Sequence, residues 1–162
     1  LQSGSYSHVV LNSILNNGND VLKFLFSELK EYKEYWYMAF KNGIRLNHDF
    51  ANFLLDIQLD ENHEDKDSFY RYFVKKISRE NFLDAIRFYN EDIFVKMIQL
   101  YSSFVITEPF IHYMLNNLSK KMLLSLFDRL ALILPKEYSL NIADAFKKEG
   151  SLEICDHITN LI

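Results

Sequence analysis

Cysteine, proline and glycine are scarce in this sequence, which has one Cys, two Pro and four Gly among its 162 residues. Because Cys155 stands alone, it cannot form a disulfide within the chain, which is typical of a reducing compartment, and we expect a cytoplasmic location. Val and Thr, which favour strands, are also few, with six and two residues. A turn-rich β-fold is therefore excluded, and the composition predicts an all-α protein.

The chain also lacks an excess of positive charge. Its 18 Lys and Arg residues stand against 22 Asp and Glu residues, which gives a formal net charge of −4. The basic doublets Lys75-Lys76, Lys120-Lys121 and Lys147-Lys148 all have acidic residues nearby. Proteins that bind nucleic acid or anionic membranes need a basic surface to meet the phosphates, so we expect neither as a partner.

Long apolar runs are missing as well. The most apolar stretch extends from Met122 to Leu134, is interrupted by Asp128-Arg129, and is too short to cross a bilayer. It predicts a buried helix and no membrane insertion.

Motifs that carry metal, cofactor or catalytic chemistry are not found in the sequence. No glycine-rich phosphate loop is present, and no Cys pair accompanies the histidines. An acidic loop at 59–67 does not resemble an EF-hand, because Asp65 and Arg71 stand where that loop needs Gly and Glu. We therefore expect no cofactor, no metal site and no enzymatic activity. The histidines are scattered along the chain at His8, His48, His63, His112 and His157.

What the sequence does contain is a series of short amphipathic segments separated by Asn, Gly or Ser. Apolar residues recur every three or four positions within each segment, which indicates helices. Local signals mark the expected helix starts and breaks. We expect about nine or ten short helices in one helical-repeat domain over 6–162, with the acidic loop at 59–67 as an insertion and residues 1–5 as a cloning scar. The signals fall at Gly18, Asn19, Gly43, Asn47, Ser78, Asn90, Thr107-Glu108-Pro109, Leu118-Ser119, Pro135 and Gly150.

Two of the breaks share a local pattern with ankyrin repeats. Residues 17–25 and 149–155 resemble the segment between the two helices of an ankyrin repeat, and residues 85–93 are a looser match. Apart from the gap that holds the acidic loop, the spacing of the breaks is near the 33 residues of that family. The Thr-Pro-Leu-His opening of ankyrin repeats is absent. The resemblance implies stacked helix–turn–helix repeats that display a surface for a protein partner, and an α-solenoid of the vesicle-coat type explains the same pattern.

The strongest candidate for a partner-binding surface is an aromatic cluster that contains Tyr32, Tyr35, Trp36 and Tyr37. Tyr32, Trp36 and Phe40 share one helical face, which leaves Tyr35 and Tyr37 on its flanks. Tyr and Trp are enriched in binding hot spots, so the cluster predicts a contact surface. The alternative is that all of these rings pack in the core.

The function expected from these observations is protein–protein recognition without catalysis, by a scaffold or adaptor. Phe, Tyr, Ile, Asn and Lys make up 65 of the 162 residues, which indicates an AT-rich genome and leads us to expect a pathogen-encoded binder of host proteins in the host cytoplasm. One alternative is a compact helical-bundle regulator of apoptosis or signalling that binds a partner helix. A more remote one is a helical enzyme domain with a polar pocket around His112, Asp128 or Cys155. The apolar last helix predicts either further domains of the same protein, which would also be partners, or a helix that caps the fold.

Overall fold

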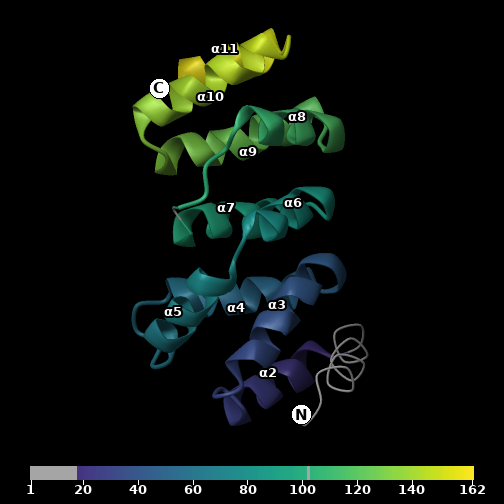
Figure 1. Cartoon of the computed structure of the whole chain (residues 1–162), viewed down its shortest axis with the longest axis vertical. Helices are drawn as coiled ribbons and strands as arrows, with labels where there is room; N and C mark the ends of the chain where they lie inside the picture. The colour runs from purple at the N-terminus through teal and green to yellow at the C-terminus, as the bar shows by residue number, and fades with distance from the viewer. Residues whose placement is uncertain (1–17, 102) are drawn as a thin grey trace. The chain divides into compact units, whose positions relative to one another are not determined.

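The structure is a computed structural model and describes residues 18–101 and 103–162 (Figure 1). Every regular element in these two ranges is a helix, which confirms the all-α prediction. The predicted helix at 6–15 and the predicted cloning scar at 1–5 lie outside the described residues. The helices are α2 (Asn19–Glu28), α3 (Lys33–Leu46), α4 (His48–Leu59), α5 (Lys66–Lys76), α6 (Arg79–Arg87), α7 (Glu91–Leu100), α8 (Glu108–Asn117), α9 (Lys120–Ile133), α10 (Lys136–Lys148) and α11 (Leu152–Leu161).

The contacts divide the chain into two compact units, with the boundary between Tyr101 and Ser102. The first unit contains α2 to α7 and the second contains α8 to α11. The sequence predicts one domain over 6–162, without this division into two units. Each unit is described separately.

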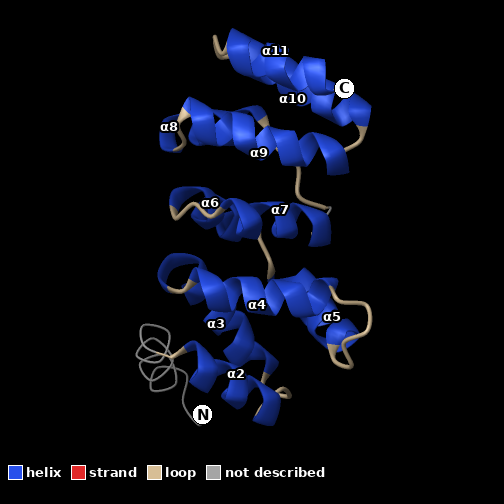
Figure 2. Ribbon diagram, turned by 180° about the vertical axis from the view of Figure 1, so that it is seen from behind, coloured by secondary structure: helices blue, strands red, loops and turns tan. Residues whose placement is uncertain are grey.

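Both units stack their helices in the same order (Figure 2). In the first unit, α3 packs against α6 and α4 packs against α7. In the second unit, α8 packs against α10 and α9 packs against α11. The first helix of one pair therefore meets the first helix of the next pair, and the second meets the second. Each unit is a short stack of helix–turn–helix pairs, and in the first unit α2 and α5 also pack on α4.

Short polar side chains begin several of these helices where the sequence predicts a start. In each case a side-chain oxygen accepts a hydrogen bond from the backbone N–H three residues later, which satisfies a donor that the helix itself cannot. Gly150 joins α10 to α11 with a φ of +83°, a conformation that glycine adopts without strain. The capping residues are Asn47, Asn90, Thr107 and Ser119, with N–O distances of 3.0, 3.1, 3.4 and 3.1 Å.

Gly43 is the clearest difference between the predicted and the observed helices. The sequence predicts a break at Asn42-Gly43, but α3 continues to Leu46 and the chain turns at Asn47. Gly43 is buried, and a Cβ atom built on it would lie 3.3 Å from the Cβ of Ala51 in α4. This glycine is present because α3 and α4 approach closely, and the turn does not require it.

The acidic loop agrees with its predicted position. It connects α4, which ends at Leu59, to α5, which begins at Lys66. Lys30 forms an ion pair with Asp65 at 3.0 Å, and the Asp60 carboxylate accepts a hydrogen bond from the Asn62 backbone at 3.0 Å. The Lys30–Asp65 ion pair joins the loop to the segment between α2 and α3.

A buried polar pair lies in the core of the first unit. The Tyr101 hydroxyl donates a hydrogen bond of 2.8 Å to Gln58 Oε1, and Gln58 Nε2 donates to the Leu54 carbonyl at 3.3 Å. Gln58 and Tyr101 are 1% and 4% exposed. Burial raises the pKa of the Tyr101 phenol well above its usual range, so the hydroxyl stays protonated and remains a donor.

We expect Tyr101→Phe to lower the free energy of unfolding by about 1–2 kcal/mol. The substitution leaves Gln58 Oε1 buried without its donor, which costs more than the hydrogen bond contributes. Urea unfolding followed by the fluorescence of Trp36 measures the change. Gln58→Leu combined with Tyr101→Phe should recover part of the loss, because both polar partners are then absent. Two single effects that simply add in the double variant would contradict this coupling.

Candidate functional site

The structure separates the four residues of the predicted aromatic cluster. Tyr32 precedes α3 and is 45% exposed, whereas Trp36 is 0% exposed. Tyr35 and Tyr37 are partly buried. The cluster is therefore neither wholly a surface nor wholly a core.

Trp36 lies in the core of the first unit. Its indole Nε1–H donates a hydrogen bond of 2.8 Å to the Leu29 carbonyl, at the end of α2. Its ring meets Phe26 edge-on at 5.3 Å between centroids and lies 6.0 Å from Phe50. Trp36 therefore joins α2, α3 and α4. The prediction that Trp36 contacts a partner is wrong, because a side chain with no exposed surface cannot reach a partner.

Tyr37 lies where α3, α5 and α6 meet. Its hydroxyl donates to Asn81 Oδ1 at 3.4 Å, and its ring stands edge-on to Phe73 at 5.9 Å. Next to it, the Tyr72 hydroxyl donates to Glu34, which also forms an ion pair of 3.4 Å with Lys76. Desolvation, followed by the hydrogen bond to Glu34, raises the pKa of Tyr72 to about 12. These contacts hold three helices together, so Tyr32 and Tyr35 are the members of the cluster best placed to meet a partner.

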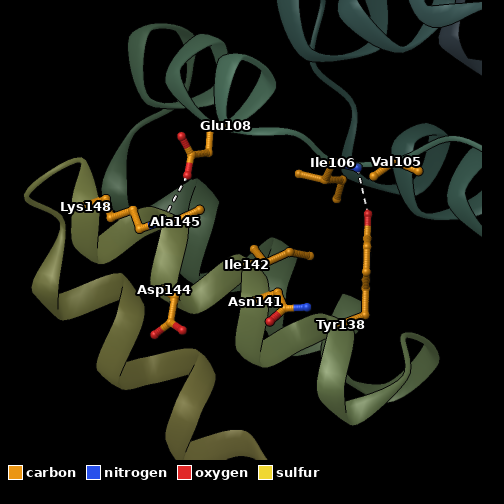
Figure 3. Close-up of a pocket in the computed structure, with 9 residues that line it drawn as sticks. All are labelled: Val105, Ile106, Glu108, Tyr138, Asn141, Ile142, Asp144, Ala145 and Lys148. Carbon is orange, nitrogen blue, oxygen red and sulfur yellow. Dashed lines mark hydrogen bonds and ion pairs between the residues drawn. The ribbon is translucent and has the colours of Figure 1, made fainter.

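The second unit contains a groove that the sequence does not predict (Figure 3). It has a volume of about 390 Å³ and lies between the segment that leads into α8 and one face of α10. The α10 residues recur at helical spacing, so they line one wall together. The lining residues are Val105, Ile106, Glu108, Tyr138, Asn141, Ile142, Asp144, Ala145 and Lys148.

Two contacts fix the walls of this groove, and both are drawn in Figure 3. The Ile106 backbone N–H donates a hydrogen bond of 2.6 Å to the Tyr138 hydroxyl oxygen. Towards the other end of α10, Lys148 forms an ion pair with Glu108 at 3.3 Å. Because Ile106 supplies the donor in the first contact, the Tyr138 hydroxyl hydrogen is left to donate elsewhere.

The groove has an apolar floor and a polar rim. Ile106, Ile142 and Ala145 are buried at its base. Asn141 and Asp144 are exposed at the rim, and the Val105 side chain is 54% exposed. An apolar floor with a few polar groups around it is the arrangement found in ligand and peptide sites.

Two of the three residues named for the enzyme alternative, His112 and Asp128, belong to separate surface pairs. His157 Nε2 lies 2.5 Å from Asp128 Oδ1, and His112 Nδ1 lies 3.3 Å from Glu149 Oε2. Cys155 is buried as a free thiol. Within the described ranges, no group of three or more His, Cys, Asp or Glu residues could hold a metal ion. Among the same residues, none of the helices is both long enough and apolar enough to cross a membrane.

Comparison of the chain with protein-family models, with curated proteins and with solved structures gave no match.

Proposed function

We propose that this chain is a non-catalytic protein–protein interaction module of the scaffold or adaptor kind, and that the groove beside α10 binds an extended peptide segment of a partner. The observation that supports this most is the groove itself, with its buried Ile106, Ile142 and Ala145 floor. An apolar side chain of a partner would exclude water from this floor. Burial of such a side chain contributes about 1.5–3 kcal/mol.

The rim of the groove suits a peptide backbone. Asn141 can donate and accept hydrogen bonds, Asp144 can accept them, and the Tyr138 hydroxyl hydrogen can be donated. These three residues lie about one turn of α10 apart, so they can meet successive amide groups of an extended chain. Val105 adds an exposed apolar contact on the opposite wall.

Tyr32 and Tyr35 form a second candidate surface for a protein partner in this proposal. Tyr32 is 45% exposed, and Tyr35 is partly exposed beside the buried Trp36 ring at a centroid distance of 5.0 Å. A buried ring behind a surface tyrosine restricts its motion, which lowers the entropy lost on binding.

The test is selection of peptides from a phage-displayed random library on the whole chain. We expect enriched peptides to bind the wild type with at least about tenfold higher affinity than they bind Val105→Glu or Asn141→Arg, because these changes put a charge on the rim of the apolar groove. Val74→Glu is the matched control, since Val74 is 44% exposed but lies on α5.

Three outcomes decide the assignment. Loss of binding in both groove variants, with binding kept in Val74→Glu, supports it. Peptides that are lost with Tyr32→Ala and Tyr35→Ala but kept by the groove variants would place the binding surface on α3 and overturn the groove. The absence of any enriched peptide would overturn the proposal of a peptide-binding module.

A further inference from the structure

Two arginines of the first unit stack on the same phenylalanine ring. The guanidinium carbons of Arg45 and Arg87 lie 5.2 and 5.3 Å from the centroid of Phe88. Arg45 is in the last turn of α3, and Arg87 is the last residue of α6. Both arginines are exposed, and within residues 18–101 and 103–162 neither side chain has an ion pair or a hydrogen bond. We call this group the Arg45–Phe88–Arg87 cluster.

Helix packing explains why these residues meet. Because α3 packs against α6, the turn from α3 to α4 and the turn from α6 to α7 lie along the same edge of the unit (Figure 1). A guanidinium that stacks on a ring uses its flat face, so the N–H groups at its edge stay available for an oxyanion. Phe88 therefore holds two cations in place without using their hydrogen-bond donors.

A hollow of about 280 Å³ adjoins Arg45 and gives the cluster a partly apolar border. It is lined by residues 45–49, among which the Leu46 side chain is 48% exposed. Asp49 also lines it, and this carboxylate forms no ion pair with Arg45. The negative charge of Asp49 repels a highly charged ligand such as nucleic acid. A single carboxylate of a ligand can still bind at the edge of the Arg45 guanidinium.

We infer that the Arg45–Phe88–Arg87 cluster binds an acidic peptide segment, with one carboxylate on each guanidinium. The two guanidinium carbons are at most about 10.5 Å apart, which is the sum of their distances to the ring centroid. In an extended peptide, side chains at positions i and i+2 point to the same side and are about 7 Å apart. Two acidic residues separated by one position therefore fall within this limit, and Arg pairs with each carboxylate through two N–H groups.

The test uses fluorescence anisotropy with a fluorescein-labelled peptide of alternating Glu and Ser, and the whole chain. We expect Arg45→Gln and Arg87→Gln to weaken binding about threefold each, and the double variant about tenfold, which are the values for exposed ion pairs. Asp49→Asn should strengthen binding, because it removes a nearby negative charge. Arg71→Gln is the matched control, because Arg71 is an exposed arginine of the same unit and its substitution removes the same positive charge.

The remaining outcomes are equally decisive. Equal affinity of the wild type and the double variant would overturn the inference, as would equal effects of Arg71→Gln and Arg45→Gln, since the binding would then depend on total charge. A peptide of alternating Gln and Ser should show no Arg-dependent binding. If a phosphoserine peptide bound at least tenfold more tightly than the Glu peptide, with the same dependence on Arg45 and Arg87, the inference of a carboxylate ligand would be overturned in favour of a phosphate.

Discussion

Trp36→Ala should lower the free energy of unfolding by about 3–5 kcal/mol, the range for the loss of a large buried ring. The Trp36 side chain has no exposed surface, and it contacts Phe26 on α2 and Phe50 on α4. The substitution also leaves the Leu29 carbonyl without its indole donor. Because Trp36 is the only tryptophan of the chain, urea unfolding is followed by far-UV circular dichroism.

Tyr35→Ala is the matched control for this prediction. Tyr35 is the neighbouring residue, is partly exposed, and stands edge-on to the Trp36 ring. Its loss should cost about 1 kcal/mol, the value of one aromatic pair. Similar losses in the two variants would contradict the assignment of Trp36 to the core. A variant that lacks both side chains would confuse unfolding with loss of binding, so binding experiments require Tyr32→Ala and Tyr35→Ala without a change at Trp36.

Most helix limits could be predicted because they depend on local chemistry. Thr107 and Ser119 each accept a hydrogen bond from the backbone N–H three residues later, so a few consecutive residues are sufficient to mark the helix start. Gly150 likewise marks a turn through its own backbone conformation. The start of α2 differs by one residue, because Gly18 occupies the predicted capping position of Asn19 and the Asn19 side chain accepts a hydrogen bond from Asn47 at 2.5 Å.

The sites depend on residues that are far apart in the chain, and the sequence pattern does not reveal which ones meet. The groove requires Ile106 and Tyr138, which are 32 positions apart. The arginine cluster requires α3 to pack against α6. The spacing of Trp36 and Phe40 correctly indicates a shared helical face, whereas Tyr32, predicted on the same face, precedes α3 and is exposed. The spacing also cannot tell whether that face is turned towards solvent or towards α2 and α4. Periodicity specifies a face, and only packing specifies its neighbour.

Gly43→Leu should lower the free energy of unfolding by about 2–3 kcal/mol, the range expected for overpacking of a well-filled interface. A Cβ at this position would lie 3.3 Å from Ala51 Cβ and 3.5 Å from the Ala51 backbone nitrogen. A leucine side chain extends beyond this already crowded Cβ, so we expect α3 and α4 to move apart. Unfolding in urea, followed by Trp36 fluorescence, measures the loss.

Two further variants separate crowding from the other effects of replacing a glycine. In Gly43→Ala the gain in helix propensity, about 1 kcal/mol, opposes the crowding of one methyl group against Ala51, so its stability should stay within about 1 kcal/mol of the wild type. Asn42→Leu adds the same side chain one position earlier, where the residue is half-buried, and should change stability by less than about 1 kcal/mol. If Gly43→Leu lowered the free energy of unfolding no more than Asn42→Leu does, the close approach of α3 and α4 at Ala51 would be contradicted.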